Sequence, residues 1–261
     1  MLPVIIIKPL VLITRIINLV YYHLSRLLEK LGKKPAWPQE LSQYFKISEQ
    51  KVISQYQEKR QIAAKLWNKK NRNTVSKIQS FYNETDYFVY RQNYFNNHKA
   101  FFDIALALFL KSKGNLCEYG AGVAPATNWL IKKFPHWQYT LADLNSPTLK
   151  FIRWRFKERT NVDFAIVASK LPLKKKYDVI ICKQVLEHVP NPLKVIKHFI
   201  KHLNSNGWLF LDFIYEPGEE NLPSSAKQRK KVLQYLKERL QAISIIDPDN
   251  PAEGYGLYKI R

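Results

Sequence analysis

Leu116-Cys117-Glu118-Tyr119-Gly120-Ala121-Gly122 is the stretch that decides the fold of this chain. Apolar residues that run into an acid and two closely spaced glycines fit a strand end and a tight turn, because a residue without a Cβ allows sharp turning and close approach of a ligand. Pro125 then begins a helix, and Asp143 directly follows the next apolar strand, residues 139–142. An acid at the end of two successive strands predicts a nucleotide-like ligand above a parallel sheet.

The alternation of strands and helices continues beyond these two strands. Further strands are predicted at residues 162–167, 177–182, 208–214, 243–246 and 255–260. Helices between them begin at Ser146-Pro147, at Asn191-Pro192 and at a serine cap, Ser224 or Ser225. Seven strands in this arrangement predict an α/β fold, a Rossmann-like doubly wound sheet whose last strand can run antiparallel after a short loop.

After the fourth strand, Cys182-Lys183-Gln184 leads into Leu186-Glu187-His188-Val189-Pro190. Together with the acid–glycine loop and Asp143, this run resembles the class I S-adenosylmethionine-dependent methyltransferases of the small-molecule type, over roughly residues 101–261. The resemblance implies that Glu118 and the glycine loop face the methionine part of the cofactor, and that Asp143 accepts hydrogen bonds from both ribose hydroxyls. The residues expected to bind S-adenosylmethionine are Glu118, Gly120, Ala121, Gly122, Asp143, Leu144, Ser169, Lys183 and Gln184.

The glycine loop alone also fits a dinucleotide site, since Asp143 lies 21 residues beyond Gly122. Two residues argue against a dinucleotide. Pro125 occupies the position of that fingerprint's third glycine, and the Glu118 carboxylate would repel a pyrophosphate. A cofactor that carries a sulfonium and an ammonium group tolerates the acid, so the methyl donor is favoured.

The chain departs from the family where the adenine amine is often held by an acid after the third strand. Val167, Ala168 and Ser169 stand there instead. Backbone groups, with Ser169 as an aid, are therefore expected to hold the adenine.

In the resembled enzymes the loop after the fourth strand borders the reaction centre, where the protein must align the nucleophile and exclude water. His188 is the candidate base for an oxygen nucleophile, because its pKa lies near neutrality. Lys183 is the candidate for orienting an anionic substrate. The competing interpretations are a structural Glu187–His188 pair and a lysine that reaches solvent.

His198 and His202 have a spacing that suits a metal, but they share a helix face with lysines and no third ligand is evident in the sequence. No metal site is expected.

The net charge of +21, from 42 Lys/Arg against 21 Asp/Glu, favours anionic partners without choosing among lipid headgroups, nucleic acid and acidic substrates. No specific nucleic acid is expected, since no Asn/Asp-Pro-Pro-aromatic motif follows the fourth strand and no RNA-binding module is recognisable. Two cysteines in apolar strands suit a reducing cytosol, and we expect a cytoplasmic protein, peripheral at the inner face of a membrane in one interpretation.

Residues 1–34 predict an amphipathic, apolar and basic helix, with Pro9 at a first helical position and Gly32 beyond its end. An apolar stripe is expected on one face at Leu10, Ile13, Ile17, Val20, Leu24, Leu27 and Leu31, with Arg15, Asn18, Arg26, Glu29 and Lys30 largely opposite. Because Lys8 and Arg15 interrupt the apolar run, we expect no bilayer crossing. Two interpretations stay open: peripheral membrane contact through residues 9–34, or packing of the stripe onto the catalytic domain or a second protomer.

Residues 35–100 predict a helical, aromatic-rich extension or lid, and residues 101–261 the methyltransferase domain. Tyr90 and Arg91 are assigned to substrate contact. The aromatic run around them contains a single cation opposed by Glu84 and Asp86, which argues against a nucleic-acid stacking platform.

The sequence therefore predicts an enzyme that methylates a small molecule, lipid-soluble or membrane-linked (quinone-like or lipid), or a sugar. The alternatives are an RNA or protein methyltransferase and a non-catalytic cofactor-binding scaffold at a membrane surface. The acceptor, the atom that is methylated and the oligomeric state are not predicted.

Overall fold

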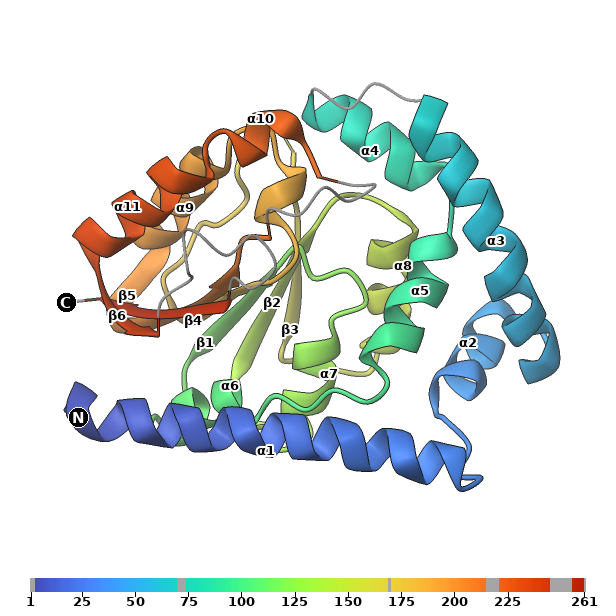
Figure 1. Ribbon diagram of the computed structural model, residues 1–261, viewed down its shortest axis with the longest axis horizontal. Helices are drawn as coiled ribbons and strands as arrows, with labels where there is room; N and C mark the ends of the chain where they lie inside the picture. The colour runs from blue at the N-terminus through green and yellow to red at the C-terminus, as the bar shows by residue number, and fades with distance from the viewer. Residues whose placement is uncertain (1–2, 70–73, 169, 215–220, 245–254, 261) are drawn as a thin grey trace.

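The computed structural model describes residues 3–69, 74–168, 170–214, 221–244 and 255–260 (Figure 1). A seven-stranded sheet with the order β3-β2-β1-β4-β5-β7-β6 forms its centre. The strands are β1 (Asn115–Tyr119), β2 (Gln138–Asp143), β3 (Val162–Ile166), β4 (Tyr177–Cys182), β5 (Leu203–Asp212), β6 (Leu240–Ser244) and β7 (Tyr255–Ile260). Only β7 runs antiparallel to its neighbours, β5 and β6, which confirms the predicted fold class.

Helices cover both faces of the sheet. They are α1 (Val4–Lys30), α2 (Trp37–Phe45), α3 (Glu49–Lys69), α4 (Val75–Asn83), α5 (Tyr87–Asn96), α6 (Phe102–Phe109), α7 (Pro125–Leu130), α8 (Pro147–Arg155), the 3₁₀ turn η1 (Leu186–His188), α9 (Pro192–His202), α10 (Pro223–Ala226) and α11 (Arg229–Arg239). One core joins α6, α7 and α8 to the sheet and the other joins α9 and α11 to its opposite face. Strand β4 is buried along its whole length, as expected of a central parallel strand covered on both sides.

Some helix and strand ends lie where the residues beside them in the sequence predicted, and others are shifted by tertiary contacts. Asn191 caps α9 as predicted, its Oδ1 accepting from the Lys194 N–H at 3.0 Å. The Ser146 hydroxyl instead pairs with the Thr148 hydroxyl at 2.7 Å, and Ser225 donates to the Leu186 carbonyl at 2.5 Å. Strand β5 begins at Leu203, before the start predicted at residue 208, and its register against β4 shifts between Leu203 and Trp208. The predicted strand residues 245–246 lie outside the described residues.

The extension α2–α5 packs beside α8, and Arg155 joins it to the domain. The guanidinium donates to both carboxylate oxygens of Glu40 at 2.6 and 2.5 Å and to Asn93 Oδ1 at 2.5 Å. It also donates to the Val123 carbonyl just after the glycine loop. A planar fork of donors suits this site, because one side chain satisfies acceptors from three segments at once.

Helix α1 lies along one side of the molecule, opposite α4 and α10 (Figure 1). It begins at Val4, so Pro9 lies inside it and not at its first turn, because the apolar residues before Pro9 continue the helix. Among the described residues, α1 is long and apolar enough to cross a membrane, judged by length and composition alone. Length and composition alone do not test the expectation that Lys8 and Arg15 prevent a bilayer crossing, and it stays a prediction.

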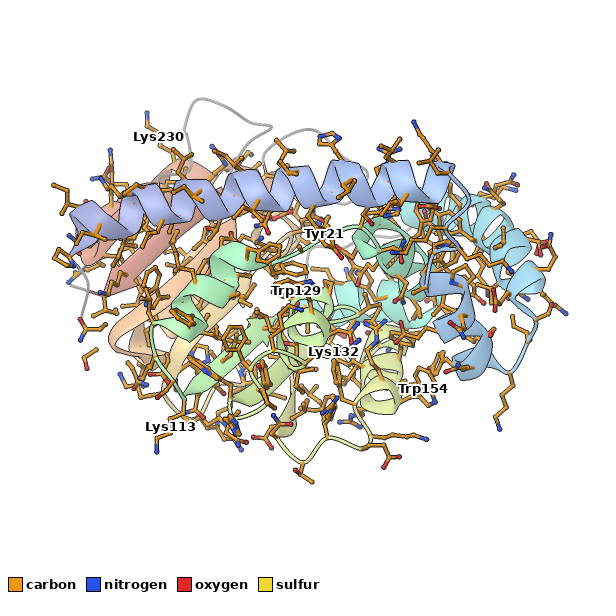
Figure 2. The ribbon with its side chains drawn as sticks, turned by 90° about the horizontal axis from the view of Figure 1, so that it is seen from below. Tyr21, Lys113, Trp129, Lys132, Trp154 and Lys230 are labelled. Carbon is orange, nitrogen blue, oxygen red and sulfur yellow. The ribbon has the colours of Figure 1, made fainter. Side chains whose placement is uncertain are left out.

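Polar side chains from the middle of α1 bond the domain. Arg15 donates to Ser244 at 2.7 Å in β6, and Asn18 bonds the Asp103 carboxylate at 3.0 Å and the Phe102 N–H at 2.9 Å. Tyr21, Phe102 and Trp129 form a chain of edge-to-face rings from α1 through α6 to α7 (Figure 2).

Most of the predicted apolar stripe points outward, whereas Leu10 is half-buried. Ile13, Ile17, Val20, Leu24, Leu27 and Leu31 are 41–75% exposed. The expectation that this stripe packs onto the catalytic domain is therefore wrong, because the polar contacts of α1 set its rotation. The start of the helix packs through apolar residues, with Ile7 and Val11 in the core.

Asn18→Ala is expected to lower the free energy of unfolding by about 1–2 kcal/mol, since it removes two hydrogen bonds, one of them to a buried carboxylate. Urea unfolding measures the change. Thr14→Ala is the control, because the Thr14 hydroxyl bonds only its own helix at Val11. Equal stability of the two variants would contradict the assignment of Asn18 to the interface.

Candidate functional site

A cavity of about 300 Å³ opens at the carboxyl ends of β1, β2 and β4. Its floor includes Tyr119, Gly120, Gly122, Asp143, Leu144 and Gln184. Its roof comes from α4 and α5, through Val75, Ile78, Tyr82, Phe88 and Gln92. The loop through His188, Val189 and Pro190 closes one side. This position at strand ends is where open α/β sheets bind ligands.

Gly120 and Gly122 make the floor possible. Both have a left-handed φ, +66° and +55°, which favours glycine. A Cβ on Gly120 would lie 2.2 Å from Val185 Cγ2, and a Cβ on Gly122 would lie 2.0 Å from Gln92 Oε1. The loop is tied to β2, because the Gly120 and Ala121 N–H groups donate to the Ala142 carbonyl. Ala121 itself is buried below the floor and does not line the cavity.

Asp143 stands in the floor at the end of β2, as predicted. Its Oδ2 accepts from the Gly122 N–H and its Oδ1 from the Leu144 N–H at 2.6 Å. Burial raises the pKa of this carboxyl to about 6, while the two hydrogen bonds oppose the rise. Each oxygen can accept a second donor, so the carboxylate fits the two hydroxyls of a ribose.

Glu118 is not among the residues that line the cavity, and its expected place beside the methionine part of the cofactor stays a prediction. Its carboxylate turns to the start of α7 and accepts from the Ala126 N–H at 3.3 Å and the Thr127 N–H at 2.9 Å. Free N–H groups at a helix start attract a carboxylate, and here the acid shapes the glycine loop from behind.

Glu118→Gln is expected to flatten the pH dependence of stability. Burial raises the pKa of the Glu118 carboxyl from 4.5 to about 7, so near pH 6 the native protein holds a proton that the unfolded chain has lost. Its contribution to stability is full below pH 4.5 and falls by up to about 3 kcal/mol as the pH rises to 7. Urea unfolding across this range compares parent and variant, and equal slopes would contradict the prediction.

Gln92 is a residue that the sequence analysis missed. It lines the cavity, and its Oε1 accepts from the Val123 N–H at 2.9 Å. Phe88, four residues earlier on α5, shares this face. The helical spacing alone offers this pair as one candidate face of α5, and only packing selects it.

Tyr90 and Arg91 do not line the cavity as expected, because packing turns another face of α5 toward it. Tyr90 lies two residues from Phe88 and Gln92, and therefore points away from the cavity. It is fully buried, donates to Gln55 Oε1 at 2.8 Å and stacks on Phe45. Arg91 is half-buried beside the Phe95 ring and does not line the cavity.

The loop after β4 contributes Gln184 and His188 to the cavity but not Lys183. Gln184 has a left-handed φ of +54°, and its N–H donates to Asp212 at the end of β5. Lys183 lies over the Phe101 ring at 5.7 Å, which leaves its expected contact with substrate unsupported. His188 is half-buried, with Nε2 3.8 Å from Oε1 of the buried Glu187.

The end of the cavity that follows β3 is apolar. Val167, Ala168 and Leu171 line it, and Ser169 lies outside the described residues. The prediction that backbone groups hold the adenine therefore stays a prediction.

His198 and His202 bond the backbone beside their helix. His198 Nε2 accepts from the Leu173 N–H at 3.1 Å, and His202 Nδ1 lies 2.9 Å from the Lys175 carbonyl oxygen. Burial and nearby cations lower the pKa of His198 to about 4. Across the described ranges, no group of three His, Cys, Asp or Glu side chains is placed to hold a metal.

Comparison with known proteins places this site in context. The Ubiquinone biosynthesis O-methyltransferase of Nitrosomonas europaea is 35% identical over 72 residues, which cover 26% of this chain and 31% of that protein. The chain thus matches about a third of that relative's length.

Solved structures with a similar fold include the N-methyltransferase NodS from Bradyrhizobium japonicum in complex with S-adenosyl-L-homocysteine, at 14% identity and a TM-score of 0.48, covering 73% of this chain and 99% of that one. Another is an O-methyltransferase family 2 protein from Planctomyces limnophilus in complex with apigenin, at 15% identity and a TM-score of 0.43, covering 58% and 52%.

The sequence model of the family described as Methyltransferase domain matches residues 90–251, more than half of the chain. The match spans the glycine loop, Asp143 and the loop with His188. The methyl donor of this family is S-adenosylmethionine, whose ribose and methionine parts suit the floor described above. The chain belongs to the methyltransferase-domain family.

Proposed function

We propose that this protein transfers the methyl group of S-adenosylmethionine to an apolar, ring-bearing small molecule of the quinol or phenol type. The observation that carries the acceptor class is the roof of the cavity. Val75, Ile78, Tyr82 and Phe88 present apolar and aromatic surface opposite the glycine loop. Such a lining suits a flat apolar acceptor better than a sugar, whose hydroxyls would need polar partners. The short match to an enzyme named for ubiquinone biosynthesis supports the same class.

S-adenosylmethionine supplies an electrophilic methyl group on a sulfonium, so the chain's own residues have to bind, align and exclude water. In this proposal the free acceptor positions of Asp143 hold the ribose hydroxyls, and the close backbone of Gly120 and Gly122 admits the methionine part. Gln92, in the roof, accepts a hydrogen bond from the Val123 N–H beside the glycine loop, and this bond holds the roof and the floor together around the ligands.

His188 is proposed as the base that takes the proton from the acceptor hydroxyl. It lines the cavity on the side between roof and floor. Glu187 Oε1 lies 3.8 Å from Nε2 of this imidazole.

His188→Gln is expected to lower kcat roughly a hundredfold at neutral pH and to leave the affinity for S-adenosylhomocysteine unchanged, because the side chain acts on the acceptor. His202→Gln is the matched control, since His202 is the last residue of α9, pairs with the Lys175 carbonyl and does not line the cavity. An unchanged kcat in His188→Gln would remove the histidine from the chemistry.

Two measurements test the function as a whole. Calorimetry with S-adenosylhomocysteine should show binding, and the absence of binding would leave a non-catalytic scaffold. Transfer of a labelled methyl group should favour hydroxylated quinols and phenols over free sugars and bulk RNA. Preferred labelling of sugar or RNA would overturn the acceptor class while keeping the enzyme.

A further inference from the structure

The outer face of α1 is the largest feature that the proposed chemistry leaves unused. We define this outer face as Leu12, Ile16, Val20, Leu24, Leu27 and Leu31, each more than half exposed. Figure 2 shows α1 running along the length of the molecule with side chains that project away from the domain. Only 11% of the most apolar 18-residue stretch of the helix is buried, whereas the core helix of a water-soluble protein is mostly buried. So much apolar surface in one place marks an interaction site.

The fold holds this face outward. Arg15 and Asn18 bond the domain, and further along Ser25 shares a hydrogen bond with His98 Nδ1 at 2.9 Å. Glu29 Oε2 lies 2.5 Å from the other ring nitrogen of His98. Turning α1 to bury its apolar face would break all of these contacts and leave charged groups without partners. The exposure is thus a property of the packed structure.

The charges around the outer face select its partner. The first 34 residues contain six Lys and Arg but one acid, and that acid, Glu29, is the one paired with His98. Lys8 and Arg26 are both exposed and are spaced by a whole number of helical turns, so they follow one flank of the face. Cations beside an apolar helix face complement anionic headgroups above an acyl layer.

We propose that α1 docks this protein on the surface of a lipid bilayer with anionic headgroups, lying in its plane with the outer face in the acyl boundary. The polar contacts from Arg15 to Glu29 hold the helix along the domain, which fits an in-plane helix and opposes a spanning one. Leu12 and Leu24 lie about 120° apart around the helix, wider than the narrow seam of a helix pair. The inference does not rest on the acceptor or on the cofactor.

Flotation of the full-length protein with vesicles tests it, using phosphatidylcholine alone and equal parts of phosphatidylcholine and phosphatidylglycerol. The parent should bind the anionic vesicles more strongly, and less at raised salt. Val20→Glu with Leu27→Glu should reduce the partition coefficient more than about tenfold. The control is Ile53→Glu with Ile62→Glu on α3, which adds the same charge at residues 44% and 53% exposed and should bind nearly as the parent does.

Three results would overturn the proposal. One is a parent that binds neither kind of vesicle, and another is equal binding by the two double variants. The third is that a second copy of the chain covers the outer face. In that case the parent would fail to float. Sedimentation velocity without vesicles would show a dimer, and Val20→Glu with Leu27→Glu would dissociate it. Circular dichroism and thermal unfolding confirm that each variant is folded, so that lost binding reports the surface.

Discussion

Gly120→Ala is expected to reduce the affinity for S-adenosylhomocysteine by more than about a hundredfold. The new methyl group would meet Val185 Cγ2 at 2.2 Å, with Val185 Cβ itself at 3.2 Å, so turning this branched side chain still leaves a tight contact. The left-handed φ of +66° adds roughly 1–2 kcal/mol of backbone strain. Relief requires a shift of the loop that carries Gln184 and His188, and this shift distorts the cavity.

The same substitution at two other glycines should reduce the affinity less. At Gly122 the same substitution meets the end of the Gln92 side chain, which can turn aside, so the loss of affinity should be smaller. At Gly32 the φ is also positive, +98°, but nothing lies within 4 Å of the added Cβ, so binding should be unaffected. Calorimetry on the three variants measures the order. Equal affinity of Gly120→Ala and Gly32→Ala would show that the glycine loop does not hold the cofactor.

Asp143→Ala is expected to weaken binding of S-adenosylhomocysteine by at least about a hundredfold. The variant loses the proposed acceptors for two ribose hydroxyls, and hydrogen bonds to a charged group contribute about 1.5–3 kcal/mol each. It also frees the Gly122 N–H, which the carboxylate now holds. The fold should survive, because burial already disfavours the charged form of this carboxyl and raises its pKa to about 6.

The matched control is Asp163→Ala on the neighbouring strand β3, which removes the same charge from an exposed residue that pairs with Lys175. Its affinity should equal that of the parent. Calorimetry and urea unfolding on both variants separate binding from stability. Undiminished binding by Asp143→Ala would mean that the ribose assignment is wrong.

The parts of the site that the sequence predicted are those set by neighbours along the chain. A strand that ends in glycines makes a tight turn wherever it is placed, and an acid that ends a parallel strand reaches the ligand edge of the sheet. Gly120, Gly122, Asp143, Leu144 and Gln184 accordingly line the cavity. The seven strands were predicted for the same reason, since each can be recognised from its own apolar residues and from the caps and prolines of the helices beside it.

The parts that were missed depend on contacts between distant segments. Glu118 was expected beside the cofactor from its place at a strand end. Its carboxylate accepts hydrogen bonds from the N–H groups at the start of α7. Phe88 and Gln92 enter the site, and Tyr90 does not, because packing against Phe45 and Gln55 sets the rotation of α5. Helical periodicity describes which residues share a face but not which face turns inward.

Helix α1 shows most clearly which features follow from the sequence and which follow from tertiary contacts. Its sequence alone determined that one face is apolar and the other polar, since 3.6 residues per turn sort the side chains by position. Only the tertiary structure decided that the polar face turns inward. Asp103, His98 and Ser244 lie in segments far along the chain, and they supply the hydrogen bonds and charges that hold Arg15, Asn18 and Glu29. Satisfying those polar groups fixes the helix, and its apolar side is left facing out.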